Sequence, residues 1–327
     1  MHASRRAPRV ITRAAGLLAL TAAVFGAAAA TASASAPSVS TGGATKVSPQ
    51  SATLNGTINP KGKATVYFFQ YGPTAAYGSQ TPEIAGGSGT SSVAASADVI
   101  GLAPATTYHY RLVARNADGT TTAGDRSFKT ANQPLGFTLS ATPNPVPYGS
   151  GVTLQGVLSG TGNAGRQVIL QQKVFPYLTD FQTVGNPQVT GSSGAFAFPL
   201  LSVTTNTQYR VETVASKPVV SEIVTLGVAV RLTTRVSSHR VRRGGHITFS
   251  GTIRPAKVGA LFAVQKLNGS GTWVTVGGGV ARGGGSTFTR YAKRVKIRRG
   301  GTFRVFVGVA DGQQVSNAGT AVRISTH

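Results

Sequence analysis

The chain has 327 residues and a formal net charge of +24, because 32 lysines and arginines stand against 8 aspartates and glutamates. It contains no cysteine, which excludes a disulfide scaffold, thiolate metal sites and thiol catalysis. Only 40% of the residues are hydrophobic, but strand-forming valine, threonine, phenylalanine and tyrosine are frequent. We therefore expect packed domains, and the length of the chain allows two or three of them.

The first 36 residues have the pattern of a secretory signal peptide. Arginines at positions 5, 6, 9 and 13 precede an unbroken apolar run over residues 14–30, and small residues follow at 32–36. We predict cleavage after Ala34 and a secreted, extracellular product, at most loosely associated with the cell wall. Export by the general or by the twin-arginine route stays open. The alternative is an uncleaved membrane anchor, for which the run is short, since a span needs about 20 residues.

Beyond residue 36 the chain has the pattern of β-strands throughout. Apolar and polar residues alternate in short runs that are separated by clusters of Gly, Pro, Asn and Ser. Clear runs occupy residues 51–58, 66–71, 168–172, 247–253 and 303–309. A spacing of about ten residues between strands predicts an all-β chain of antiparallel sandwiches, each with roughly 100 residues.

Residues 37–131 are expected to form the first domain. Within it, Leu102, Pro104, Thr106 and Tyr108 have the spacing of a tyrosine corner, and residues 102–119 resemble the last loop and strand F of a fibronectin type III domain. The resemblance implies that the Tyr108 hydroxyl bonds to a backbone group upstream. It also implies a spacer, adhesion or accessory-binding module that lacks catalysis of its own. Alternation predicts that Tyr108, Tyr110, Leu112 and Ala114 point inward, and that His109, Arg111, Val113 and Arg115 point outward.

One surface of this first domain is a candidate carbohydrate site. If Tyr67, Phe69 and Tyr71 face the core, then Phe68 faces outward, and strands C and F are neighbours in the fold that the resemblance implies. Phe68 would then lie beside His109 and Arg111, where an aromatic and polar patch could stack on a sugar ring. The alternatives are a partly exposed apolar residue, which is common, and a contact with the second domain.

Residues 137–230 and 231–327 are predicted to be two copies of one sandwich, after a linker over residues 132–136. Residues 152–158 return as 247–253, and residues 209–211 return as 303–305. Less specifically, the two copies resemble bacterial immunoglobulin-like repeats of secreted proteins. The whole chain is therefore expected to be three tandem fibronectin type III and immunoglobulin-like β-sandwiches after a signal peptide. Residues 228–232 run almost directly from the second sandwich into the third, which predicts a joint that flexes little.

The third domain carries nearly all of the charge of the mature chain. It has 17 basic residues and one acid, Asp311, whereas the second domain has 4 basic and 3 acidic residues. Because the two copies share a fold pattern, the fold does not require this charge. A basic field of this density favours anionic polymers such as cell-wall teichoic acid, acidic polysaccharide or extracellular DNA. The alternative is a basic domain that is merely solvated.

The fold implied by the resemblance collects the A–B, C–C′ and E–F turns at one end of a sandwich. In the third domain we expect residues 240–245 in the A–B turn and 293–301 in the E–F turn. The predicted binding site for an anionic polymer is therefore a distal tip that contains Arg240, Arg242, Arg243, Lys266, Lys293, Arg294, Lys296, Arg298 and Arg299.

The sequence gives little sign of catalysis. The eight acids are scattered, and glycosidases need two carboxylates about 5–10 Å apart. Asp118 and Asp125 are interpreted as turn residues, and the Gly-rich segment 160–165 as a hairpin loop, because a strand and not a helix follows it. We expect no metal site, no cofactor and no enzymatic activity, and we expect a monomer.

These observations predict a secreted, non-catalytic binding or spacer protein of the cell surface, whose basic distal domain binds anionic polymers. A neighbouring secreted enzyme or surface protein could be a further partner. One alternative is a carbohydrate-binding accessory protein in extracellular polysaccharide degradation. A hydrolase with an unrecognised site is the other.

Overall fold

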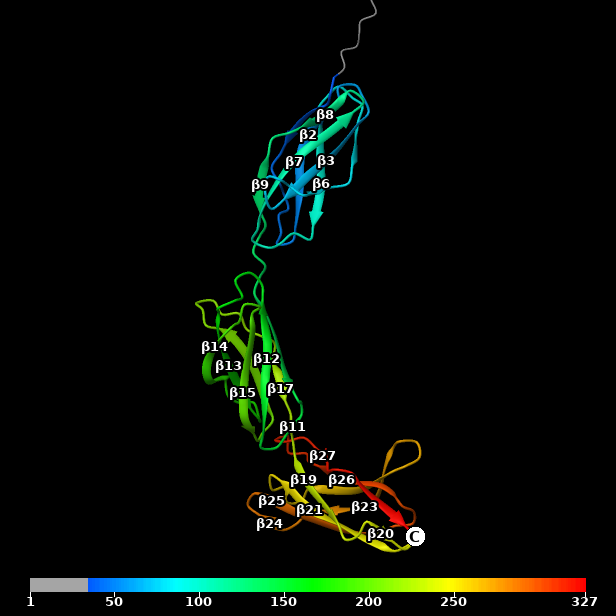
Figure 1. Cartoon of the computed structure of the whole chain (residues 1–327). Helices are drawn as coiled ribbons and strands as arrows, with labels where there is room; N and C mark the ends of the chain where they lie inside the picture. Colours follow the sequence, from blue (N-terminus) through cyan, green and yellow to red (C-terminus); the bar gives the residue numbers. More distant parts are fainter. Residues whose placement is uncertain (1–34) are drawn as a thin grey trace, which may run out of the picture.

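The structure, a computed structural model, describes residues 35–327 and consists there of β-strands, turns and loops. The predicted signal peptide and its cleavage after Ala34 lie outside the described residues, apart from Ser35 and Ala36. Within the described range no helix is long and apolar enough to cross a membrane. Figure 1 shows three sandwiches that follow one another along the chain. The predicted fold class, an all-β chain of tandem antiparallel sandwiches, is confirmed.

The first sandwich packs the sheet β1-β2-β6 against the sheet β4-β3-β7-β8, in which β5 also pairs with β3 and β9 with β7. Large apolar side chains fill the space between the sheets, and Leu54, Phe69, Tyr110 and Leu112 are all 0% exposed. The strands are β1 Ser38–Thr41, β2 Ser51–Asn59, β3 Thr65–Gly72, β4 Ser79–Gln80, β5 Ile84–Gly87, β6 Val93–Ile100, β7 Thr107–Asn116, β8 Gly119–Thr122 and β9 Arg126–Lys129.

The tyrosine corner is present at the start of β7. The backbone N–H of Ala103 donates a hydrogen bond of 2.9 Å to the Tyr108 hydroxyl, and the Tyr108 ring stacks on Phe128. The alternation along β7 places Val113 outside the core, as predicted, but only 4% of this residue is exposed. Val113 lies in the middle of the sheet between Phe68 of β3 and Thr122 of β8, so neighbours on both sides cover its small side chain.

The second and third sandwiches share one topology. In each, a sheet led by the first strand, β10-β12-β15 or β19-β21-β25-β24, packs against a sheet around β13 and β16 or β22 and β26. Each also has a parallel pair, β11 with β18 and β20 with β28. The strands of the second sandwich are β10 Gly136–Thr142, β11 Val146–Pro147, β12 Ser150–Ser159, β13 Gln167–Val174, β14 Gln182–Val189, β15 Ala195–Val203, β16 Thr207–Thr213, β17 Val224–Leu226 and β18 Val228–Ala229. Those of the third are β19 Arg231–Val236, β20 Arg240–Val241, β21 His246–Arg254, β22 Leu261–Leu267, β23 Trp273–Val280, β24 Gly284–Gly285, β25 Phe288–Lys296, β26 Gly301–Gly308, β27 Asn317–Ala318 and β28 Val322–Thr326.

In each sandwich, the strand that pairs with the first strand (β2, β12 or β21) has a glycine that lets the first strand approach closely. A Cβ atom built on Gly56, Gly156 or Gly251 would lie 2.6, 1.9 or 1.8 Å from a carbonyl oxygen of the neighbouring first strand. At Gly251 the hydroxyl of Tyr291 also crosses the site, 2.7 Å from that Cβ position. Only glycine can therefore occupy this position.

The first and second sandwiches are joined by a very short free segment. The N–H of Ala131 donates to the carbonyl of Ser48 in the first sandwich. The N–H of Gln133 already donates to the hydroxyl of Thr161, on the Gly-rich loop of the second sandwich. Residue 132 alone separates these two attachments.

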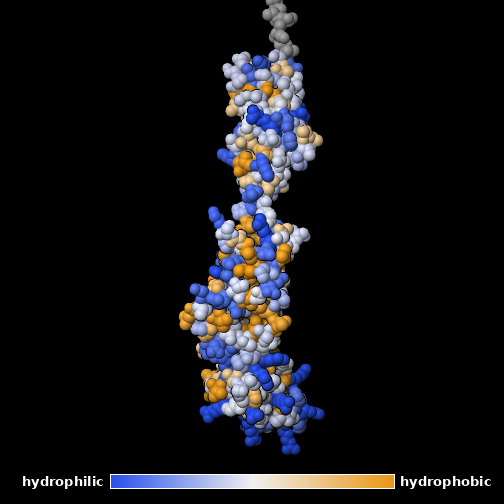
Figure 2. Space-filling view, turned by 90° about the vertical axis from the view of Figure 1, so that its left-hand side faces the viewer, coloured by the Kyte–Doolittle hydropathy of each residue, from blue (hydrophilic) through white to orange (hydrophobic). Residues whose placement is uncertain are grey.

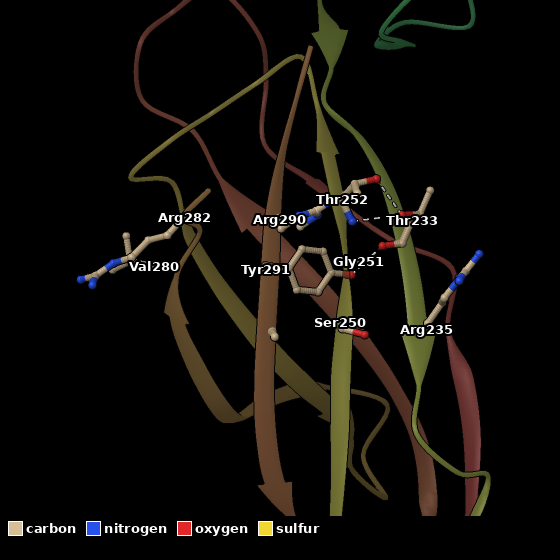
Figure 3. Close-up of a pocket in the computed structure, with 10 residues that line it drawn as sticks. Thr233, Arg235, Ser250, Gly251, Thr252, Val280, Arg282, Arg290 and Tyr291 are labelled. Carbon is tan, nitrogen blue, oxygen red and sulfur yellow. Dashed lines mark hydrogen bonds between the residues drawn. The ribbon is translucent and has the colours of Figure 1, made fainter. Parts of the chain in front are cut away.

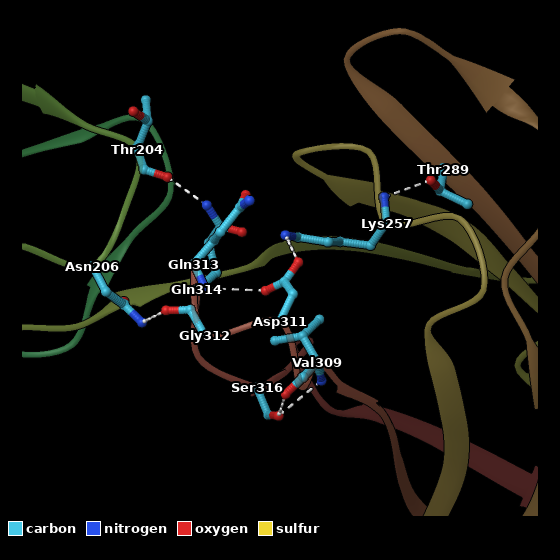
Figure 4. A network of polar contacts seen from close by, with 10 residues as sticks. All are labelled: Thr204, Asn206, Lys257, Thr289, Val309, Asp311, Gly312, Gln313, Gln314 and Ser316. Carbon is cyan, nitrogen blue, oxygen red and sulfur yellow. Dashed lines mark hydrogen bonds and ion pairs between the residues drawn. The ribbon is translucent and has the colours of Figure 1, made fainter. Parts of the chain in front are cut away.

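The joint between the second and third sandwiches is hydrogen-bonded (Figure 4). The Asn206 side chain donates to the carbonyl of Gly312 at 2.8 Å and accepts the N–H of Val228 at 2.7 Å. The amide of Gln314 donates to the carbonyl of Thr204 at 2.6 Å. The backbone of Val315 bonds to Val228 and Val230, at the end of the second sandwich. These contacts fix the loop between β26 and β27 to the end of the second sandwich.

We expect Asn206→Ala to loosen this joint, because the buried N–H of Val228 and the partly buried carbonyl of Gly312 would lose their partner at a cost of about 1–3 kcal/mol. Gln313→Ala is the control, since its side chain is exposed and its backbone makes the contact with Asn206. Residual dipolar couplings measure the effect. One alignment tensor should fit both sandwiches in the wild-type chain and in the control, and two should be needed for Asn206→Ala. A single tensor for all three chains would contradict this role.

Candidate functional site

The distal end of the third sandwich is built from the turns before β21 and after β25, together with β28. The N–H of Gly244 donates to the carbonyl of Ile297, and the N–H of Ile297 donates to the carbonyl of Gly245, both at 2.7 Å. The N–H of Arg243 donates to the carbonyl of His327 at 3.1 Å. In Figure 1 β20 and the C-terminus lie together, away from the second sandwich. The two charged turns therefore share one end of the molecule.

Basic side chains from three segments meet at this end. The ammonium group of Lys266 donates to the carbonyl of Arg299 at 2.9 Å and lies 5.7 Å from the centre of the Phe303 ring. Figure 2 shows hydrophilic residues projecting from the lower part of the molecule, where the third sandwich lies. A hollow of about 560 Å³ is lined by five of the nine predicted residues, Arg243, Lys266, Lys296, Arg298 and Arg299.

The predicted extent of the E–F turn was wrong. β25 continues to Lys296, because residues 293–296 pair with residues 246–249 of β21. Alternation then separates three residues that we expected at the tip. Arg294 and Lys296 lie on the outer face of the sheet, whereas the stem of Lys293 lies beside Gly277 of β23. Similarly, Arg240 lies in β20, and only Arg242 and Arg243 belong to the turn that follows.

The single acid of the third sandwich lies at its opposite end. Among the described residues, the contact between Lys257 and Asp311 is the one ion pair of this sandwich. Partial burial acts to raise the pKa of Asp311, but hydrogen bonds from Lys257 and from the N–H of Gln313 outweigh it and hold this pKa below its usual value. Asp311 is thus ionised at neutral pH and compensates Lys257 at the joint, so the distal charges are left uncompensated.

The outer face of the sheet β19-β21-β25-β24 is a second basic surface, which the sequence analysis missed. Figure 3 shows a hollow on this face, with Thr233, Thr252 and Arg235 on one side and Val280 and Arg282 on the other. Its volume is about 730 Å³. The signal that could have revealed it is the spacing of arginines at i and i+4 in two strands that this fold places in one sheet. The exposed arginines of this face are Arg231, Arg235, Arg254, Arg282, Arg290 and Arg294.

The predicted patch on the first sandwich is only partly assembled. The register places Phe68 opposite Val113, not beside His109, because Gln70 pairs with Arg111 and Gly72 with His109. Arg111 instead donates to the Gln70 amide oxygen at 2.8 Å, and its guanidinium lies 4.6 Å from the centre of the Tyr77 ring. Tyr77 was missed because the loop after β3 brings it back over the sheet. A hollow of about 410 Å³ adjoins Tyr77 and Arg111.

Asp125 makes side-chain contacts with two residues, His109 and Tyr77, which its position in a turn does not require. Its carboxylate contacts the His109 ring at 2.8 Å and accepts a hydrogen bond of 3.0 Å from the Tyr77 hydroxyl. The hydrogen bond with His109, followed by that from Tyr77, lowers the pKa of Asp125 below its usual 3.8 although burial acts in the opposite direction. Interpreting Asp125 as a turn residue only was therefore incomplete. Asp118 does lie in the tight turn between β7 and β8, where its N–H bonds to Asn116.

A lowered folded-state pKa means that ionised Asp125 stabilises the first sandwich above the unfolded-state pKa, and that this contribution is lost as pH falls through the folded-state pKa. We expect Asp125→Asn to lower the free energy of unfolding at pH 7 by less than about 1 kcal/mol, since the group is well exposed. The difference from wild type should shrink in acid. Denaturant unfolding at neutral and at acid pH measures it, and a difference that does not change with pH would contradict this account.

Comparisons with known proteins give only weak likenesses. No family model matches the chain, and no curated protein matches it. Among solved structures it is similar to domains A168–A170 of titin, with 15% identity and a TM-score of 0.37 over 89% of this chain and 99% of that one. It is similar to the FN1–FN3 domains of chicken CNTN1, with 14% identity and a TM-score of 0.31 over 89% and 99% of the two chains. A tetra-tandem repeat in the extending region of a large adhesion protein gives 15% identity and a TM-score of 0.26, over 89% of this chain and 74% of that one. Likenesses at these scores carry no argument about function.

Proposed function

We propose that the chain is a secreted, non-catalytic binding and spacer protein, in which the third sandwich binds anionic polymers. The first two sandwiches hold this basic domain at a distance from the start of the chain. Teichoic acid, acidic polysaccharide and extracellular DNA are the polymer classes that this charge suits.

The observation that carries this proposal is the uneven charge of two sandwiches with one topology. The third has 17 basic residues and one acid, and that acid is paired with Lys257 near the joint. The second has 4 basic and 3 acidic residues on the same arrangement of strands. Mutual repulsion among the distal charges disfavours the folded domain unless a counter-charge offsets it, and a polyanion is the partner that supplies one.

The test is retention of the mature chain, residues 35–327, on immobilised teichoic acid, polygalacturonate and duplex DNA, with neutral dextran as the reference. A tip variant has glutamine in place of Arg240, Arg242, Arg243, Arg298 and Arg299. A control variant loses the same number of charges from exposed positions of the first sandwich, Lys46, Lys61, Lys63, Arg126 and Lys129. We expect the tip variant to elute from every polyanion at lower salt than wild type, and the control to behave as wild type. No retention of wild type, or equal losses in both variants, would overturn the proposal.

A second candidate function, recognition of a neutral carbohydrate, rests on the hollow beside Tyr77 in the first sandwich. Gln70, Gln80 and Arg111 line it together with this aromatic ring, and amide, guanidinium and aromatic groups are suited to sugar hydroxyls and ring faces. Binding at such a site would persist at high salt, whereas binding through charged groups weakens because salt screens them. Binding of neutral oligosaccharides at high salt that is lost in Tyr77→Ala would support it. Equal binding by the variant would exclude it.

A further inference from the structure

The outer face of the sheet β19-β21-β25 differs from its counterpart in the second sandwich at five exposed positions. The two faces have the same register. Gly136 pairs with Ser159 in the second sandwich, and Arg231 pairs with Arg254 at the equivalent positions of the third. In the same way, the pair Val157 and Ala195 corresponds to the pair Thr252 and Arg290. Each equivalent position is displaced by 95 residues. The second sandwich has Gly136, Ser140, Ser159, Ala195 and Pro199, where the third has Arg231, Arg235, Arg254, Arg290 and Arg294.

These arginines form a track along the strands. Rows of outward-facing residues are about 7 Å apart, since each residue of a strand advances about 3.3–3.4 Å. Successive rows contain Arg231 with Arg254, then Arg290, then Arg235, then Arg294. The next row contains His246 and Lys296 and adjoins the turns at the distal tip. We call Arg231, Arg235, Arg254, Arg290 and Arg294 the arginine track.

Hydroxyl groups lie between the arginines. Thr233 and Thr252 face each other across β19 and β21, with their hydroxyl oxygens 2.8 Å apart. Ser250 lies in the row that contains Arg235. With Arg282 and Arg290 these residues line the hollow of about 730 Å³. The face therefore alternates guanidinium forks with small groups that both donate and accept hydrogen bonds.

Among the described residues that line this hollow, no aromatic ring is open to stack on a nucleic-acid base. Tyr291 is 3% exposed, and its hydroxyl donates to the carbonyl of Thr233. The half-buried Phe288, two residues before Arg290, already lies under Arg254 and Arg290, whose guanidinium carbons are 5.7 and 5.5 Å from the ring centre. Proteins that bind single-stranded nucleic acid rely on open aromatic platforms. Three strands span only about 10 Å, and this width suits a single linear polymer chain.

We propose that the arginine track binds a linear polysaccharide that carries carboxylate groups, lying along the strands toward the distal tip. This inference rests on the proposed function and names its polymer class and its site. Arginine forks bind carboxylates through two parallel hydrogen bonds, and Thr233, Ser250 and Thr252 are placed to bond to sugar hydroxyls between them.

The test compares two variants of the mature chain that lose the same charge. The track variant, Arg235→Ser, Arg254→Ser and Arg290→Ala, takes the residues that stand at these positions of the second sandwich, where the same strands form. For this test the tip variant is limited to three substitutions, with glutamine in place of Arg240, Arg242 and Arg243. Affinities are measured for polygalacturonate, teichoic acid, single-stranded DNA and duplex DNA. For polygalacturonate we expect a loss of about tenfold in the track variant and of about threefold or less in the tip variant. For duplex DNA the two losses should be equal.

A complementary gain-of-binding variant keeps the proposal testable if the track variant folds poorly. Ser140→Arg, Ser159→Arg and Ala195→Arg build a second track on the second sandwich, and should strengthen polygalacturonate binding severalfold. Wild-type binding with equal losses in the track and tip variants would overturn the track but leave the proposed function standing. Tighter binding of DNA or teichoic acid than of polygalacturonate would overturn the polymer class. No binding of any polyanion by wild type would refute the proposed function itself.

Discussion

Replacing Gly251 with alanine is expected to destabilise the third sandwich by about 3 kcal/mol or more, because overpacked sites that cannot relax exceed the usual range of about 1–3 kcal/mol. The new Cβ would lie 1.8 Å from the carbonyl oxygen of Thr233 and 2.7 Å from the Tyr291 hydroxyl. The backbone blocks the new Cβ on one side. On the other side it is blocked by the Tyr291 phenol, which hydrogen bonds to Thr233 and Thr234 hold in place. Neither neighbour can move away without a loss of stability. The melting temperature of the domain should fall by about 15 °C, since 1 kcal/mol is worth about 4–8 °C at this size.

The matched control for this substitution is Gly269→Ala. Gly269 is exposed in the loop after β22, and a Cβ built on it would meet nothing within 4 Å. This variant should differ from wild type by less than about 0.5 kcal/mol. Thermal unfolding followed by near-ultraviolet circular dichroism of Trp273, the single tryptophan of the chain, reports on the third sandwich. Equal melting temperatures for the two variants would show that the first strand does not need this close approach.

Binding of duplex DNA by the mature chain is expected to fall about 10³-fold between 50 and 200 mM salt, if about six phosphates are neutralised. Each phosphate contact releases counterions and contributes about −0.9 to the slope of log K against log salt. The charges are concentrated in one sandwich and, apart from Lys257, have no ion-pair partner among the described residues. They are therefore available for such contacts.

The slope is a sharper readout than affinity, because it counts the contacts. Replacing Arg242, Arg243, Arg298 and Arg299 with glutamine should make the slope shallower by about 2 to 4, according to how many of these residues meet a phosphate. Replacing Lys61 and Lys63, on the first sandwich, should leave it unchanged. Fluorescence anisotropy at a series of salt concentrations measures both. A slope near zero for the wild-type chain would mean that the basic domain is only solvated.

The sandwich fold could be predicted because strand alternation is a local property of the sequence. The runs at residues 51–58 and 247–253 became β2, which is one residue longer at its end, and β21, which is one residue longer at each end. The tyrosine corner was equally predictable, since Tyr108 and Ala103, which are hydrogen-bonded, are only five residues apart in the chain. Exposure was less predictable. Val113 alternates as an outward residue but is covered by its neighbours in adjacent strands, which no pattern within β7 reveals.

The candidate site was predictable where charge alone defines it. Concentration of arginine and lysine in residues 231–327, and the meeting of two of their turns at one end, followed from composition and from the expected topology. The hydrogen bond between Tyr77 and Asp125 could not be predicted, because the two residues are 48 positions apart in the chain and only the loop conformation brings them together. The arginine track also escaped, because it becomes visible only when the register of three strands is known.

The most direct test of the account is a map of which residues an anionic polymer touches. Amide chemical shifts of the mature chain, recorded by NMR during titration with a short oligogalacturonate, provide that map. We predict changes that concentrate on the arginine track and the distal turns of the third sandwich, with none on the equivalent strands β10, β12 and β15 of the second sandwich. Changes spread evenly over both sandwiches, or no changes at low salt, would contradict the claim that the third sandwich is the binding domain.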